Sequence, residues 1–138
     1  MPKIPIYSPV QVAVSSLLGG PCAAVFVIWK NFQGFGNSTG ARQTIIWGTL
    51  LALLIFAIVP FLPEKFPNYG IPLGYTAVAM SIVRQHQWSK KAILESGTYE
   101  VRSNWNVLGI TIGFLFVSAA IVLSWVFILV FMGIVSLD

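Results

Sequence analysis

Cys22 and His86 are the side chains best suited to nucleophilic or metal chemistry, and each is the single residue of its type in the sequence. The acidic residues are Glu64, Glu95, Glu100 and Asp138. A zinc site needs three or four protein ligands, and a nucleophile needs a base close to it. The apolar run around Cys22 contains no acidic residue and no histidine. We therefore expect no metal site, no cofactor and no enzymatic activity.

The most chemically varied stretch of the chain runs from 84 to 106, between two apolar runs. Its candidate partner-docking residues are Arg84, His86, Trp88, Lys90, Lys91, Tyr99, Arg102 and Trp105. Two interpretations stay open for this stretch, a solvated connector in contact with lipid and a surface that docks a partner protein. Basic residues in short loops beside apolar runs are typical of membrane topology signals, so we expect no nucleic-acid binding.

Small residues spaced four apart form the second motif of the sequence. Gly109 and Gly113 make a G-x-x-x-G pair, and the same spacing relates the helix-packing candidates Ser16, Gly20 and Ala24. Such residues share one face of a helix and let a second backbone approach closely. We expect them to pack helices of this chain against one another, with a dimer contact as the alternative.

Polar residues and prolines interrupt the apolar runs. The polar residues are expected to form hydrogen bonds between helices. They are Gln11, Ser15, Ser16, Thr49, Thr76, Ser81, Thr111, Ser118 and Ser124. Pro21 removes a backbone donor and predicts a kink in the first run.

Four apolar runs must position these residues, and their length indicates a membrane as the surrounding solvent. Hydrophobic residues make up 57% of the chain and charged residues 9%, against about 25% charged residues in a soluble domain. The last run would reach about 46 Å as a helix, more than the hydrocarbon core of about 30 Å. The predicted spans are about 9–29, 44–62, 69–88 and 107–137.

These spans predict an all-α integral membrane protein, one domain over 1–138 with four transmembrane helices. The third span is the weakest, because its uncharged part is short and contains Pro72 and Gly74. Three crossings with a re-entrant or interfacial helix at that place are the alternative. Both arrangements put six basic residues inside and two outside, so the positive-inside rule does not choose between them. Both place the C-terminus outside. We also expect the helix of the third span to continue in water through 89–96 and to stop at Gly97.

Three functions agree with this composition. We favour a non-catalytic accessory, stabilising or regulatory subunit that packs against a larger membrane assembly. The alternatives are an immunity-type protein that neutralises a membrane-inserted toxin and a homo-oligomeric channel. The expected partners are the lipid bilayer and either another membrane protein or a second copy, with no small-molecule substrate indicated. The chain resembles small inner-membrane proteins of bacteria in size and segment layout, so we expect the bacterial inner membrane.

Overall fold

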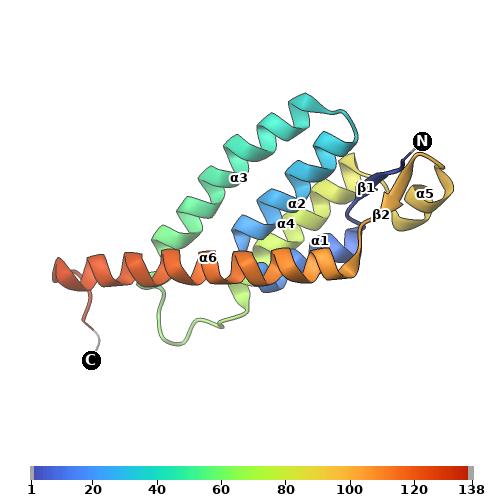
Figure 1. Cartoon of the computed structure of the whole chain (residues 1–138). Coiled ribbons are helices and arrows are strands. Elements are labelled where there is room, and N and C mark those ends of the chain that lie inside the picture. Colours follow the sequence, from blue (N-terminus) through green and yellow to red (C-terminus); the bar gives the residue numbers. More distant parts are fainter. Residues whose placement is uncertain (1, 137–138) are drawn as a thin grey trace.

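The first apolar run folds back on itself at Gly20, as the computed structural model of residues 2–136 shows (Figure 1). Its two arms are α1 (Pro9–Gly19) and α2 (Pro21–Gly34). Gly20 has φ +87°, a conformation that residues with a Cβ rarely adopt, and Pro21 opens α2. The prediction of one helix over 9–29 is therefore wrong, because Gly20 reverses a chain that a proline alone would only bend.

The remaining long helices, α3 (Ser38–Ile58), α4 (Gly70–His86) and α6 (Asn104–Phe131), follow the predicted runs more closely. The short helices between them are the 3-10 helix η1 (Val59–Phe61) and α5 (Lys90–Glu95). Strands β1 (Ile4–Ile6) and β2 (Tyr99–Val101) form a parallel pair. The mostly helical fold is confirmed, and the small sheet is an addition that an all-α class did not include.

Local signals explain where the elements begin and end. The Asn37 side chain accepts a hydrogen bond from the Gly40 N–H at 2.8 Å, so α3 begins six residues before the predicted span. Ser89 caps α5 by accepting from the Ala92 N–H at 3.3 Å. The predicted continuous extension through 89–96 is therefore a separate short helix, although the predicted stop at Gly97 is confirmed by its φ of +69°.

Within residues 2–136, two segments are long and apolar enough to cross a membrane, Ser38–Phe61 and α6. Only 11% and 6% of their most apolar windows are buried within the chain. A core helix of a soluble protein would bury most of that surface, whereas these helices turn it outward. In Figure 1, α6 passes along one side of the other helices, and its C-terminal part extends beyond them.

The contacts of the small sheet bring distant parts of the chain to one end of the molecule. Ile4 pairs with Tyr99, and Ile6 pairs with Val101. Tyr7, which follows β1, is hydrogen-bonded to Asn31 near the end of α2. Five parts of the chain therefore lie together: β1, the end of α2, the start of α3, the end of α4 and the start of α6.

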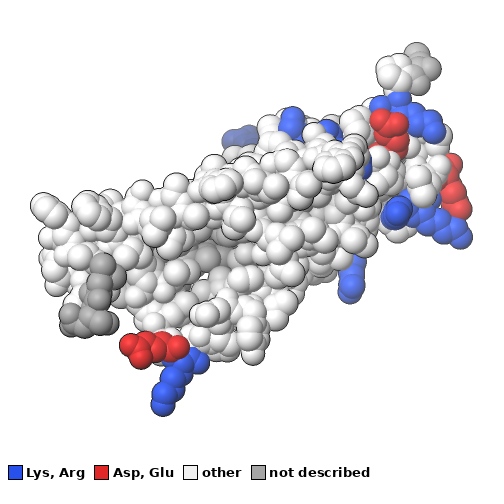
Figure 2. Space-filling model, turned by 60° about the horizontal axis from the view of Figure 1, so that its bottom comes forward, with Lys and Arg blue, Asp and Glu red and all other residues white. Residues whose placement is uncertain are grey.

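We call this region the charged end. Figure 2 shows most charged side chains gathered toward one end of the molecule and a small group far from them. The basic residues of the charged end are Lys3, Lys30, Arg42, Arg84, Lys90, Lys91 and Arg102. The eighth basic residue, Lys65, lies beside Glu64 on the loop between η1 and α4, at the opposite end of those helices.

Candidate functional site

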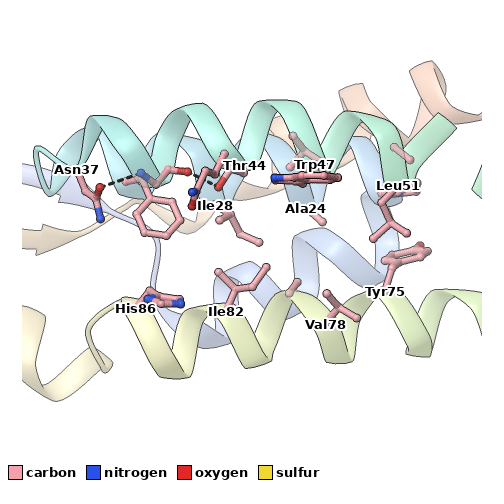
Figure 3. Close-up of a pocket in the computed structure, with 18 of the residues that line it drawn as sticks. Ala24, Ile28, Asn37, Thr44, Trp47, Leu51, Tyr75, Val78, Ile82 and His86 are labelled. Carbon is pink, nitrogen blue, oxygen red and sulfur yellow. Dashed lines mark hydrogen bonds between the residues drawn. The ribbon is translucent and has the colours of Figure 1, made fainter. Parts of the chain in front are cut away.

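A groove of about 440 Å³ separates α3 from α4, and residues of α2 line it as well (Figure 3). Its depth depends on how closely α3 approaches α2. A Cβ built on Gly48 would lie 2.7 Å from Cγ2 of Val25, so glycine is needed for this approach. Ala24, Ala52 and Ala79 also line the groove, and their small side chains leave it open. We call this space the α3–α4 groove.

The α3–α4 groove changes from polar to apolar along its length. Figure 3 shows Asn37 and His86 at one end and Leu51 and Tyr75 at the other. The polar lining residues are Asn37, Thr39, Gln43, Thr44 and His86. The larger apolar lining residues include Trp47, Leu51, Ile55, Val78 and Ile82. Among the residues that the structure describes, no Asp, Glu, Lys or Arg lines the groove.

A second hollow of about 390 Å³ continues this space toward the loop between η1 and α4. The two hollows share Pro21, Ile55 and Tyr75 in their linings. The shared region is mainly apolar and lies beside Gly20, where the α1–α2 hairpin reverses. Such a lining suits hydrocarbon and opposes the passage of a hydrated ion.

Asn31 fixes the helices of the groove relative to the N-terminus, and sequence reasoning missed it. Its side chain is buried, accepts a hydrogen bond from the Tyr7 N–H at 2.8 Å and donates to the Tyr7 carbonyl at 2.9 Å. It also donates to the side chain of Gln87 at 2.9 Å, and Gln87 donates to the Ile28 carbonyl at 3.3 Å. From the sequence, a single asparagine near the end of an apolar run looks the same whether it is buried between segments or exposed in a loop. No sequence signal therefore identified Asn31.

A second polar cluster connects α1 to the start of α6. The Gln11 amide donates to the Arg102 carbonyl at 2.6 Å and to the Asn104 side chain at 2.9 Å. The Arg102 guanidinium lies 4.8 Å from the centre of the Tyr7 ring. Burial raises the pKa of the Tyr7 hydroxyl, and the charge of Arg102 lowers it in part. The Tyr7 hydroxyl donates to the Asn106 side chain at 3.1 Å.

Hydrogen bonds between α1 and α6 agree with what the sequence predicts for the polar residues of the apolar runs. The hydroxyl of Thr111 donates to that of Ser15 at 3.3 Å, and Ser118 donates to the Gly19 carbonyl at 3.2 Å. Ser81, by contrast, accepts a hydrogen bond from Gln85 of its own helix. Only part of the predicted set therefore joins helices.

The two groups of predicted helix-packing residues differ in whether other helices contact them. Ser16, Gly20 and Ala24 lie in packed surroundings, but the reversal at Gly20 places them on two helices and not on one stripe. A Cβ built on Gly109 or Gly113 would meet no atom within 4 Å. The intramolecular contact expected at these two glycines is not made.

Part of the predicted docking segment is occupied by contacts within the chain. Trp88 and Tyr99 pack with Phe35, with ring centres between 5.0 and 5.6 Å apart. Arg102 donates to the Pro5 carbonyl at 3.2 Å, and His86 lines the α3–α4 groove. These side chains therefore contact other segments of the charged end.

The other predicted docking residues are exposed. Arg84 lies in the last turn of α4, and Lys90 begins α5. Lys91 forms a solvent-exposed ion pair with Glu95 at 3.9 Å, and Trp105 is 82% exposed at the start of α6. The predicted segment is therefore divided between internal contacts and separate exposed side chains.

Within residues 2–136 the structure brings no three His, Cys, Asp or Glu side chains together at a place that could hold a metal ion. The features that stand out are the α3–α4 groove and the exposed glycine pair of α6. A comparison of the chain with protein-family models, curated proteins and solved structures found no match.

Proposed function

We propose that the chain is an integral membrane protein with three crossings, α3, α4 and α6, and one re-entrant hairpin, α1–α2. The arms of the hairpin measure about 16 and 21 Å, well short of a hydrocarbon core of about 30 Å. At the charged end, α1 begins and α2 ends. The 17 residues of α4 reach about 26 Å, and Arg84 in its last turn can extend its side chain to the membrane surface, so we include α4 among the crossings. This arrangement keeps the three-crossing alternative of the sequence analysis, but the first apolar run takes the re-entrant place that the third was expected to hold.

The charge distribution supports an inside position for the charged end. With the hairpin in place, seven basic residues lie at the charged end and Lys65 alone at the other. This bias exceeds the six to two of either arrangement considered from sequence, and basic residues favour the cytoplasmic side. The end of α6 then faces outward, and the bacterial inner membrane remains the expected location.

Within that membrane we propose a non-catalytic accessory role in which the outer face of α6 packs against another membrane protein. The observation that carries this proposal is the open pair of glycines, Gly109 and Gly113. Phe116 and Phe127 share their face and are each 71% exposed. Small residues in membrane helices concentrate where two helices touch, because they let the backbones approach.

Photocrosslinking in cells tests this role. A photoreactive amino acid in place of Phe116 is expected to give one discrete crosslinked product of larger mass. The same residue in place of Leu53, which is 58% exposed on α3, should give none. Gly113→Leu should abolish the product from position 116, because the added side chain separates the two helices.

The identity of the crosslinked product also distinguishes between the three proposed functions. A product with a different protein supports the accessory role, and one that forms only when a toxin is present supports the immunity role. A product of twice the chain's mass indicates self-association and, together with ion flux in liposomes, the channel. Diffuse labelling from position 116, equal to that from position 53, would overturn the proposed contact.

A further inference from the structure

We propose that the charged end binds anionic phospholipids of the inner leaflet through basic side chains that the helices turn outward, toward the surrounding lipid. This inference rests on the membrane placement proposed above and is independent of the partner at α6. It adds to that placement the class of lipid and the side chains that select it.

Basic residues stand at the same end of four helices. Each lies at most four positions inside the end of its helix or just before the start of the helix. These residues are Lys30 on α2, Arg42 on α3, Arg84 on α4 and Arg102 before α6. In the proposed placement this end lies at the inner surface of the bilayer, where long basic side chains reach the phosphates of the head groups.

Three of these basic residues lie on helix faces that are turned away from the α3–α4 groove. Phe32, Thr44 and His86 line the groove, and each follows one of the basic residues by two positions. Two positions are about 200° apart around a helix, so the basic side chains belong to the opposite faces. Arg42 and Arg84 are exposed on those faces. They are therefore directed at what surrounds the molecule, which in a membrane is lipid.

The positive charge of this end is largely uncompensated within the chain. Among the described residues, Glu95 and Glu100 are the acidic residues of the charged end, against seven basic ones. Glu95 pairs with Lys91, and no carboxylate of residues 2–136 lies within ion-pair distance of Arg42 or Arg84. An excess of basic residues at the cytoplasmic surface attracts anionic lipids.

Tryptophans lie among these basic residues. The ammonium of Lys30 lies 4.9 Å from the centre of the Trp29 ring, and Trp105, three positions after Arg102, is 82% exposed. Tryptophan rings concentrate where acyl chains meet head groups. Exposed indole and basic groups at one level therefore favour a lipid surface as the partner over a soluble acidic protein.

The test uses two lipid probes that differ only in their head group. The full chain is reconstituted into phosphatidylcholine vesicles with a trace of phosphatidylglycerol or phosphatidylcholine that carries a diazirine near the glycerol. Adducts are mapped by mass spectrometry, and the ratio of phosphatidylglycerol to phosphatidylcholine adducts is compared between the two ends of α3 and α4. The ratio should be about threefold or more higher in 42–47 and 80–84 than in 54–58 and 70–74. Equal ratios at the two ends would overturn the inference, whereas no adducts with either probe would overturn the membrane placement on which it rests.

A matched set of variants checks that the arginines select the head group. Arg42→Gln with Arg84→Gln should lower the ratio at the charged end toward that at the opposite end. Arg42→Lys with Arg84→Lys should keep the preference, because the charge remains. Lys65→Gln, at the opposite end, is the control and should leave the ratio at the charged end unchanged. An unchanged preference in the glutamine double variant would contradict the proposed selection.

Ionic strength separates the charge of the head group from its size. At about 1 M salt the Debye length shrinks to about 3 Å, so the preference of these exposed side chains for phosphatidylglycerol should fall. Labelling by the phosphatidylcholine probe should not change. A preference that does not depend on salt would overturn the inference, since charge would not be its cause.

Discussion

At the scale of single residues, two polar side chains near the charged end connect segments that are distant in the sequence. Gln11 and Asn31 each bind groups from segments far apart in the sequence. Interhelical hydrogen bonding by Gln11 follows from an amide inside an apolar run. Asn31 could not be identified in this way, because its partners are backbone groups of Tyr7 that become its neighbours only after the hairpin closes.

Asn31→Ala should lower the free energy of unfolding by about 2–3 kcal/mol, because it leaves the buried N–H and carbonyl of Tyr7 without partners. Thermal unfolding in detergent measures the effect. Asn68→Ala, in the exposed loop before α4, is the matched control and should change the melting temperature little. Equal melting temperatures for the two variants would contradict the role of Asn31.

Tyr7 predicts a dependence of stability on alkaline pH. Burial raises the pKa of its hydroxyl in the folded chain, although Arg102 opposes part of the shift. The folded state then holds this proton more tightly than the unfolded state, whose tyrosine pKa is about 10. The stabilisation is therefore complete below about pH 10 and is lost as the pH rises through the folded pKa.

Unfolding experiments between pH 8 and pH 11 test this dependence. The unmodified chain should lose more stability above pH 10 than Tyr7→Phe, which has no hydroxyl to titrate. Tyr69→Phe, at a position that is 68% exposed, should follow the unmodified chain. If Tyr7→Phe lost as much stability above pH 10 as the unmodified chain, the raised pKa of Tyr7 would not contribute to the pH dependence.

At the scale of elements, apolar composition located the ends of α4 within two residues and those of α3 and α6 within six. It could not reveal the hairpin, since an uninterrupted apolar run has the same composition whether it is straight or folded back. The reversal depends on the backbone conformation of Gly20 and on its contact with α6. Pro21 signalled a disturbance at the right place, but a proline inside a helix is equally compatible with a kink.

Three Gly→Ala variants separate the causes of the reversal. A Cβ at Gly20 would be strained at φ +87° and would lie 2.6 Å from the Ser118 hydroxyl oxygen. Gly36 has φ +71° with open space around it, and Gly74 is helical and open. Gly20→Ala should destabilise most, Gly36→Ala by about 1 kcal/mol, and Gly74→Ala not at all or slightly the other way. Thermal unfolding should give this order of stability. If Gly20→Ala were as stable as Gly36→Ala, a tight contact between Gly20 and α6 would be excluded.

At the scale of the whole molecule, the proposed re-entrant hairpin would decide on which side of the membrane Lys3 lies. Four crossings and a hairpin with three crossings agree for every segment after 37 and differ only before it. The sequence alone left this question open, because basic residues are split six to two in both arrangements first considered. The proposed re-entrant hairpin would add Lys3 to the inside group and make the bias seven to one.

Labelling of single cysteines in a Cys22→Ala background tests the arrangement in cells. Lys3→Cys and Asn37→Cys should both be protected from an impermeant reagent, as should Lys91→Cys. Asn68→Cys, on the loop between η1 and α4, should be labelled. Labelling of Lys3→Cys with Asn37→Cys protected would restore four crossings and rule out the re-entrant hairpin.

The parallel pairing of β1 with β2 sets an order of events during synthesis. Ile4 is synthesised 95 positions before its partner Tyr99. During that interval the newly made hairpin lacks both the strand pairing and its hydrogen bonds with α6. Such distant contacts form late, after the chain between them has been ordered. A nascent chain halted before residue 99 should therefore carry a hairpin without these stabilising contacts, which form only when β2 and α6 have been synthesised.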